Sequence, residues 1–467
     1  MKGYGEYKNT EYDWLPMVPA HWKHITIRSL MQLSDTRCKN RSDLELLSVY
    51  REYGVIKKNS REDNHNKASL DISNYKYVGK NFVVMNKMKM WQGSLGISAF
   101  EGIVSPAYIV CTIRKDLNFR YLNFLLRSHL FKTFYNRISY GIRVGQWDLR
   151  YDNLKTLNLF LPPREEQDQI VRYLDAKAGK INKLIKIKQQ QIALLKEKKQ
   201  AIINQAVTKG LDLSAPMKDS GIAWIGQIPQ GWDVIQFSRI ITDITQGWSP
   251  VAGNGDRQEG QWGVLALSAI NDGDFFPDAA KPIPLNITVN SDLELRKGDF
   301  LLTRSNTRAL VGDVCIVDIN TEKLIPSDLI YKLTTNDIEN KYLLYMMKSF
   351  IGRQQIEQSA HGSSGTMPKI THRHIKSWKI LLPPIEEQNK IVNYISSNIS
   401  VIKDSILHLQ RIISTITEYR TRLISEVVTG KVDVRHIYIA DNQLTDLEED
   451  YCIEETNNSF NILECKA

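Results

Sequence analysis

The chain is 467 residues long and carries 61 basic and 52 acidic residues, for a net charge of +9. This length provides for roughly two to four domains, each with its own core. The opening residues MKGYGEYKNTEYDWLP lack the apolar core of a signal peptide, and no apolar run approaches the ~18–20 residues of a membrane span. Five scattered cysteines without CxxC spacing indicate neither a zinc knuckle nor a disulfide framework. We therefore expect a cytoplasmic protein, and its charge is compatible with a nucleic-acid partner.

Two motifs occur twice along the chain. WLPMVPAHW begins at Trp14 and is answered by WIGQIPQGW from Trp224. LPPREEQDQIVRYLD begins at Leu161, and LPPIEEQNKIVNYIS begins 221 residues later, at Leu382. A repeat of this kind indicates a tandem duplication of units of roughly 200 residues.

Between these motifs, each half is predicted to hold a mixed α/β domain. KNFVVMNK, AYIVCTIR, KGDFLLTR, VCIVDI and DLIYKLTT have the apolar runs of strands. RYLNFLLRSHLFKTFYN and NKYLLYMMKSFIGRQQIEQS have helical apolar spacing. Each helical stretch is followed by a glycine-containing polar loop, SYGIRVGQWDLR or AHGSSGTMPKITHRH. The scaffolds match in order while the loops differ, as expected for two recognition modules with different targets.

A long helix is predicted after each Pro-Pro pair. Proline suits the first turn of a helix, and the acidic pairs that follow favour the positive end of its dipole. Apolar residues then recur by fours and threes, which favours a coiled coil of roughly 65 Å over two separate surface helices. The predicted seam consists of Leu174, Ile181, Ile185, Ile192, Leu195, Ile202, Ile395, Ile402, Ile406, Leu409, Ile413, Ile416 and Leu423.

Lys199 and Arg420 fall at equivalent seam positions of the two copies. A basic residue in an apolar seam can fix register or partner choice. The alternative is that each side chain extends to solvent near its helix end.

The predicted fold is α+β, with two similar recognition domains in tandem and two long antiparallel helices with pseudo-two-fold symmetry. The expected divisions are 1–161 for the first recognition domain, 162–210 for the first long helix, 211–382 for a linker and the second recognition domain, 383–430 for the second long helix, and 431–467 for an acidic, flexible tail.

Motifs for catalysis are missing from the sequence. There is no GxxxxGK[ST] loop, and no glycine-rich turn follows a predicted strand. His372 and His374 could form a metal pair, but no acidic or cysteine partner lies near them in sequence, so no metal site is predicted. We expect a protein that binds and does not catalyse.

The repeated hinge motifs, with AVTKGLD and VVTGKVD at the helix ends and SGIAWIGQIPQGWDV opening the second half, resemble the specificity (S) subunits of type I restriction-modification systems. The resemblance covers roughly residues 12–435, and the acidic tail falls outside it. It implies that each variable domain reads one half of a split double-stranded DNA target. It also implies that the helices space the two halves and dock two methyltransferase (M) subunits, with two restriction (R) subunits joining them. S-adenosylmethionine would then belong to the M subunits, and ATP with Mg²⁺ to the R subunits, so that this chain binds no cofactor.

Base reading requires Arg, Lys, Asn or Gln side chains that reach the edges of bases, while other polar side chains hold phosphates. For each candidate below, a solvated surface residue is the competing interpretation. Trp91 and Trp248 are interpreted as core residues, with wedging against a base as the alternative. The predicted DNA-binding residues are Lys87, Lys89, Gln92, Arg143, Gln146 and Arg150 in the first domain and Arg304, Asn306, Arg308, Ser364, Lys369 and Arg373 in the second.

Two other functions stay open from the sequence alone. One is a non-catalytic coiled-coil scaffold or adaptor that binds only protein. The other is a degenerate enzyme, such as a methyltransferase relic.

Overall fold

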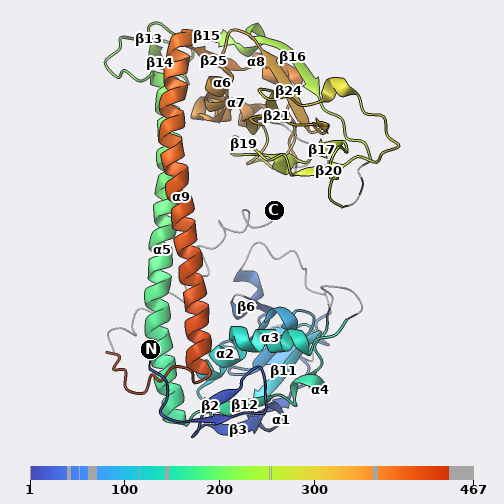
Figure 1. Cartoon of the computed structure of the whole chain (residues 1–467), viewed down its shortest axis with the longest axis vertical. Helices are drawn as coiled ribbons and strands as arrows, with labels where there is room; N and C mark the ends of the chain where they lie inside the picture. Colours follow the sequence, from blue (N-terminus) through green and yellow to red (C-terminus); the bar gives the residue numbers. More distant parts are fainter. Residues whose placement is uncertain are drawn as a thin grey trace. The chain divides into compact units, whose positions relative to one another are not determined.

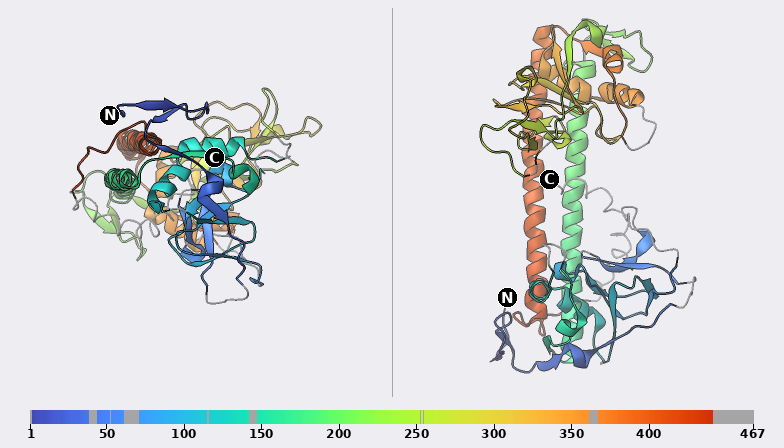
Figure 2. Two further views of the ribbon diagram at one scale, coloured as in Figure 1. Left: turned by 90° about the horizontal axis from the view of Figure 1, so that it is seen from below. Right: turned by 90° about the vertical axis from the view of Figure 1, so that its right-hand side faces the viewer.

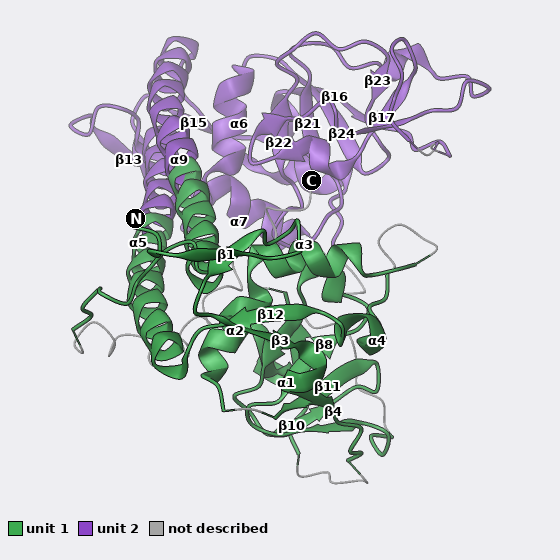
Figure 3. Cartoon of the chain, turned by 60° about the horizontal axis from the view of Figure 1, so that its bottom comes forward, with its two compact units in different colours: residues 1–189, 410–467 green, residues 190–409 purple. Residues whose placement is uncertain are grey.

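The computed structural model describes residues 2–38, 44–51, 53–60, 71–114, 116–141, 147–251, 253, 255–360 and 367–440. The chain forms two compact units (Figures 1 and 3). Unit 1 comprises residues 1–189 and 410–467, and unit 2 comprises residues 190–409. The division between the units falls inside both long helices.

Unit 1 contains short strands, a pair of packed helices and one end of each long helix. Its strands are β1 (Tyr7–Asn9), β2 (Met17–Pro19), β3 (Lys23–Thr26), β4 (Met31–Leu33), β5 (Leu47–Tyr50), β6 (Gly54–Lys57), β7 (Lys76–Val78), β8 (Val83–Asn86), β9 (Leu95–Ile97), β10 (Gly102–Val104), β11 (Tyr108–Ile113) and β12 (Asn158–Leu161). Its helices are α1 (Ile27–Leu30), α2 (Phe119–Arg127), α3 (His129–Arg137), α4 (Tyr151–Leu154) and the first part of α5 (Arg164–Lys209), with 3₁₀ turns η1 (Lys58–Ser60) and η2 (Met90–Gln92).

Unit 2 repeats this plan, with one more strand among the described residues. Its strands are β13 (Met217–Asp219), β14 (Gln227–Pro229), β15 (Asp233–Gln236), β16 (Ile241–Gln246), β17 (Gly263–Leu265), β18 (Ile270–Asn271), β19 (Asp274–Phe275), β20 (Ala280–Pro282), β21 (Phe300–Thr303), β22 (Val314–Ile316), β23 (Leu324–Ile325), β24 (Ile330–Thr335) and β25 (Lys379–Leu382). Its helices are α6 (Asn340–Lys348), α7 (Phe350–Ser359), α8 (His372–Ser377) and the first part of α9 (Ile385–Val428), with 3₁₀ turns η3 (Phe237–Arg239), η4 (Leu267–Ala269) and η5 (Ser291–Leu293).

The central sheets of the two units have the same antiparallel strand order. Unit 1 has β4-β11-β8-β9 and unit 2 has β16-β24-β21-β22. Val110 pairs with Val84 in the first sheet, and Leu301 pairs with Lys332 in the second. The five predicted strand segments correspond to β8, β11, β21, β22 and β24. The predicted α+β fold with two similar domains in tandem is confirmed.

Each predicted helical stretch in the domains forms two helices, with a break at Ser128 or Ser349. The Ser349 hydroxyl caps α7 by accepting the Gly352 N–H. A Cβ on Gly352 would lie 2.4 Å from the Met347 carbonyl oxygen, so only glycine fits this close turn.

The two long helices begin at equivalent hinges. In the first, the Gln167 amide donates to the Pro162 carbonyl at 2.9 Å, and its oxygen accepts the Asn118 N–H at 3.0 Å. In the second, Gln388 donates to the Pro383 carbonyl at 2.9 Å and accepts the Glu339 N–H at 2.9 Å. A repeated glutamine therefore ties each helix start to the beginning of α2 or α6.

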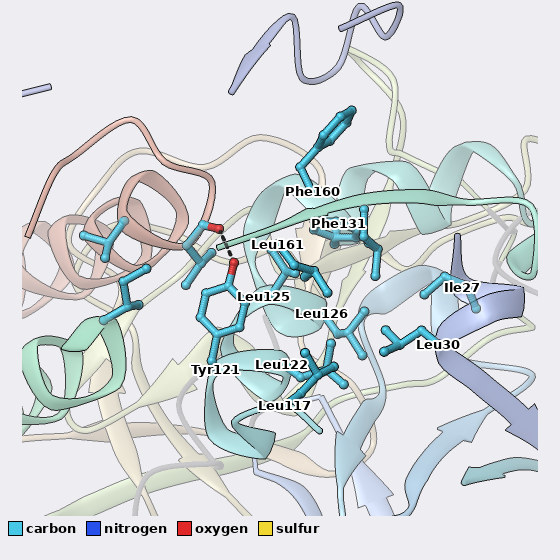
Figure 4. Close-up of a cluster of buried hydrophobic side chains, with 14 of the residues drawn as sticks. Ile27, Leu30, Leu117, Tyr121, Leu122, Leu125, Leu126, Phe131, Phe160 and Leu161 are labelled. Atoms are coloured by element: carbon cyan, nitrogen blue, oxygen red, sulfur yellow. Dashed lines mark hydrogen bonds between the residues drawn. The ribbon is translucent and has the colours of Figure 1, made fainter. Parts of the chain in front are cut away.

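The core of unit 1 joins the recognition domain to both long helices (Figure 4). Tyr121 and Leu122 of α2 are fully buried, and the Tyr121 hydroxyl donates to the Val428 carbonyl of α9 at 3.2 Å. Leu174 of α5 and Val427 of α9 belong to the same cluster. The core of unit 2 likewise includes α6, the end of α5 and the start of α9.

Within each unit, α5 and α9 run side by side in opposite directions (Figure 2). Unit 1 combines the start of α5 with the end of α9, and unit 2 combines the end of α5 with the start of α9. All thirteen predicted seam residues are buried or half-buried. The two basic seam residues have different partners, because Arg420 donates to Asn182 at 2.6 Å, whereas Lys199 contacts Asp272 of the recognition domain.

The predicted divisions of the chain require two changes. The helices do not form a body of their own, since each unit includes parts of both. The tail predicted to begin at residue 431 is packed at its start, because Val432, Val434 and Ile439 lie in the core of unit 1. Residues 441–467 lie outside the described residues. Among the parts of the chain that the structure describes, no helix is long and apolar enough to cross a membrane.

Candidate nucleic-acid interface

Two loops meet at the end of β8 in unit 1. Lys87 directly follows this strand, and its carbonyl accepts the Leu149 N–H at 3.1 Å. The Lys87 ammonium lies 2.9 Å from Asp148 Oδ2. The rings of Trp91 and Trp147 are 5.1 Å apart. The fold therefore brings the loop after β8 and the loop after α3 into one surface.

The predicted residues of the first domain fall on this surface where they are described. Lys89 and Arg150 are exposed, Gln92 is half-buried, and the Lys87 side chain is 41% exposed. Arg143 and Gln146 lie outside the described residues. Trp91, interpreted from the sequence as a core residue, has a side chain that is only partly buried, and its ring packs against that of Trp147.

A cavity of about 340 Å³ opens beside the Lys87–Asp148 pair. Tyr140, Asp148, Arg150 and Asn153 line it, which gives it hydroxyl, carboxylate, guanidinium and amide groups. The Asp148 Oδ1 atom is buried and has no hydrogen-bond partner among the described residues. The structure adds Tyr140, Trp147 and Asn153 to the candidate site residues predicted from the sequence. Their place near Lys87 could not be read from the sequence, because it depends on contacts between segments far apart in the chain.

Unit 2 builds a corresponding surface at the end of β21. Arg304 follows the strand, and its carbonyl accepts the Ile370 N–H at 2.9 Å. Its guanidinium donates to the Asp328 carbonyl at 3.3 Å and lies 5.7 Å from the centre of the Tyr331 ring. These contacts hold the Arg304 side chain half-buried against the sheet, so it is positioned before any ligand arrives.

A bridge between Ser305 and Lys369 places Lys369 opposite the residue that follows Arg304. Asn306 is half-buried, whereas Arg308, Lys369 and Arg373 are exposed. Ser364 lies outside the described residues. Trp248 is 38% exposed, so its interpretation as a core residue is wrong. The geometry adds Trp248, Ser249 and Asp328, with Ser249 Oγ donating to the Asp328 carboxylate at 2.5 Å.

The two surfaces carry opposite charges at a matched backbone position. Leu149 and Ile370 make the same bond to the residue after the strand, and the residues just before them are Asp148 and Lys369. A carboxylate can accept from the amino group of cytosine, while a lysine donates to guanine. Two similar frames therefore present different chemistry to a ligand.

His372 and His374, the two histidines considered as a metal pair, make contacts that stabilise the fold. The His372 ring packs against Tyr331 at 4.8 Å, and His374 completes the capping box of α8 with Thr371. In the described part of the chain, no cluster of three or more His, Cys, Asp or Glu is arranged to hold a metal. Burial raises the pKa of the Cys111 thiol to about 12, so this cysteine is a poor nucleophile.

The family model for the type I restriction modification DNA specificity domain matches residues 19–196 and 278–412, which is more than half of the chain. The chain belongs to this family. The resemblance to type I specificity subunits drawn from the hinge motifs is confirmed. Because the model describes a DNA specificity domain, membership supports DNA sequence recognition as the general role of the chain.

Individual relatives are distant in sequence. The EcoEI specificity subunit of Escherichia coli is 28% identical over 172 residues, which is 36% of this chain but only 29% of that protein. The MjaVIII specificity subunit of Methanocaldococcus jannaschii is 24% identical over 367 residues, covering 74% of this chain and 79% of that protein. A solved chain from work on complex assembly and conformational transition of the type I R-M system has a TM-score of 0.59 at 15% identity. It covers 89% of this chain and 99% of that chain, and it supports the fold of the specificity family.

Proposed function

We propose that this chain is the sequence-specific DNA-binding subunit of a type I restriction-modification complex. Each recognition domain reads one half of a bipartite, asymmetric target in double-stranded DNA. The observation that carries this proposal is the pair of matched frames with different side chains, Lys87 with Asp148 in one and Arg304 with Lys369 in the other. Identical loops would read a palindrome, whereas different loops read two unrelated half-sites.

The chain supplies recognition and docking, and its partners supply the chemistry. We propose that two M subunits dock on the long helices and that two R subunits join the assembly. S-adenosylmethionine then binds to the M subunits, and ATP with Mg²⁺ to the R subunits, while this chain catalyses no reaction. Because its proposed target is cellular DNA, the complex works in the cytoplasm.

A domain exchange tests the two-part reading. Residues 20–160 are replaced by the first domain of another specificity subunit, and methylated motifs are mapped by sequencing DNA from cells with the M subunits. One half-site should change, while the other half-site and the gap stay the same. A change in both halves would contradict the assignment of one half-site to each domain.

Point substitutions test the surface itself. Lys369→Ala with Arg373→Ala should weaken binding of the complex to the mapped target by roughly 10- to 100-fold, the range for lost base contacts. Lys297→Ala is the matched control, because Lys297 is exposed before the opposite end of β21. No specific binding by the wild-type complex, with M subunits bound, would favour a scaffold that contacts only protein.

A further inference from the structure

A short hairpin in unit 2 is built to hold a fixed shape. Strands β18 and β19 pair through Asn271 and Asp274, with Asp272 and Gly273 as the two-residue turn. Both turn residues have positive φ, at 51° and 90°, as the type I′ turn of a tight hairpin requires. A Cβ on Gly273 would lie 3.0 Å from the Lys348 ammonium, so glycine also leaves room for that lysine.

The two aspartates of this hairpin reach three helices. Asp272 accepts from Lys199 of α5 and from Lys348 of α6, each at 2.5 Å. Asp274 accepts from Lys403 of α9 at 2.6 Å. The side chains of Lys199 and Lys348 are only 12% and 10% exposed, so their ammonium groups depend on Asp272 as a counter-charge.

The end of α6 is tied to α5 by further bonds. The Gln200 amide donates to the Lys348 carbonyl at 3.0 Å, and Asn204 Oδ1 accepts the Phe350 N–H at 2.8 Å. Burial lowers the pKa of the Lys348 ammonium, and Asp272 opposes that shift. Loss of the Asp272 charge would therefore leave Lys348 between two helices without this counter-charge.

The hairpin is also bonded to the base of the loop that carries Arg304, Asn306 and Arg308. The Asp272 N–H donates to Asp313 Oδ2 at 2.8 Å. The Thr303 N–H donates to the Asp313 carbonyl at 2.8 Å, and the Asp313 N–H donates to Thr303 Oγ1 at 2.9 Å. Thr303 is fully buried and directly precedes Arg304. A continuous chain of bonds thus runs from the long helices to the candidate reading loop, residues 304–310.

We propose that the hairpin latch, formed by Asp272 and Asp274 with Lys199, Lys348 and Lys403, positions the reading loop on the long helices and so restricts the gap length that the complex accepts. Asp272 and Asp313 are positioning residues that need not touch DNA. This inference rests on the proposed function, since a gap exists only if the target has two parts. Hydrogen-bond and salt-bridge networks of this kind can carry energetic coupling between separate parts of a protein.

The test measures gap discrimination in the assembled complex. The bipartite motif is first mapped by methylation in cells carrying the wild-type chain and M subunits. Purified complexes are then titrated with duplexes that hold both half-sites at the native gap or at a gap changed by one base pair. The wild-type complex should prefer the native gap by roughly tenfold, the scale of one wrongly placed base pair. Asp272→Asn, which tolerates the left-handed turn, should reduce this preference to about threefold or less while the bases read stay unchanged.

Controls separate positioning from folding and from the proposed function. Asp278→Asn removes the same charge at an exposed site of the same unit and should keep the full preference. If Asp272→Asn fails to fold, Asp274→Asn provides the test, because its pair with Lys403 is half-exposed and exposed ion pairs contribute little to stability. Unchanged gap preference in the folded latch variant overturns the inference. Absence of any bipartite methylated motif with the wild-type chain overturns the proposed function instead.

Discussion

Trp22 and Trp232 occupy equivalent places in the two copies, yet of their two indole N–H groups only that of Trp22 has a hydrogen-bond partner among the described residues. Trp22 is 1% exposed, and its indole N–H donates to Glu166 Oε1 at 3.0 Å. Trp232 is 0% exposed, and its indole nitrogen has no partner among the described residues. Replacing each tryptophan with phenylalanine therefore removes a similar volume but different polar contacts.

The two variants should differ in free energy of unfolding because only one of the replaced indoles is hydrogen-bonded within the described residues. Each variant loses packing, on the order of 1–3 kcal/mol. Trp22→Phe also loses a bond to a charged acceptor, which contributes about 1.5–3 kcal/mol. Trp232→Phe instead removes a buried donor whose unpaired state costs about 1–3 kcal/mol in the native protein. We expect Trp22→Phe to be the less stable variant by at least about 2 kcal/mol.

Urea unfolding of the full chain, with hydrogen exchange followed in each unit, measures this difference. Two local readouts are needed because the substitutions lie in different units. A double-mutant cycle of Trp22→Phe with Glu166→Gln should be non-additive, since the two residues share a bond. Equal losses in the two phenylalanine variants, or a larger loss for Trp232→Phe, would refute the assignment of the Glu166 bond as the distinguishing interaction.

Three further predictions concern stability and assembly. Burial raises the pKa of the Asp175 carboxyl to about 6, despite the opposing charge of Arg120. The stability that the protonated carboxyl provides is therefore present below about pH 4 and is lost as pH rises through 6. Asp175→Asn should raise the free energy of unfolding at pH 7 by up to about 3 kcal/mol, with no gain below pH 4, as measured by urea titration. Gly430→Ala should destabilise unit 1 in thermal unfolding, because a Cβ there would lie 2.4 Å from Pro19 Cδ. Ile185→Glu with Ile406→Glu should abolish binding of M subunits in size-exclusion assays, because carboxylates in a half-buried seam cost several kcal/mol, on the order of 2–7 each.

Matched variants isolate the cause of each effect. Gly221→Ala has the same φ of 75° as position 430 but no atom within 4 Å of the added Cβ, so it should show only the smaller backbone cost, about 1–2 kcal/mol. Ile187→Glu with Leu407→Glu places the same charges on exposed positions that are 50% and 46% accessible, and it should keep the helix pair intact. Similar losses in a variant and its control would show that the proposed contact is not the cause. A constant stability difference for Asp175→Asn across pH 4–8 would contradict its raised pKa.

The long helices were predictable to within two residues at both ends. Pro163 and Pro384 fix where each helix can begin, and glycines at positive φ follow the ends at Gly210 and Gly430. The central strands were predictable because their apolar runs are short and bounded by polar turns. Signals of this kind act within a few residues, so they can be read without knowledge of the fold.

The candidate surfaces were only partly predictable. The sequence places Lys87 and Arg304 after strands, but their bonds to Leu149 and Ile370 join segments far apart along the chain. The packing of Val434 could not be predicted for the same reason, because the residues around it come from the other end of the chain. The Asp272–Gly273 turn carried a strong local hairpin signal, yet its partners on three helices depend on tertiary structure.

The repeated hinge motif shows which residues make the same hydrogen bonds in both copies. Gln167 and Gln388 bond to backbone groups at the helix start, and both make the same two bonds. Losing either side chain would leave two backbone groups unpaired, at about 1–3 kcal/mol for each one that is buried. Glu166 accepts from side chains, among them the Trp22 indole, whereas the matching Trp232 indole in the second copy has no partner in the described part of the chain. A duplicated backbone offers the same groups in both copies, so the two glutamines keep the same bonds. The Trp and Glu residues are also identical in the two copies, yet among the described residues only Trp22 and Glu166 share an indole–carboxylate bond.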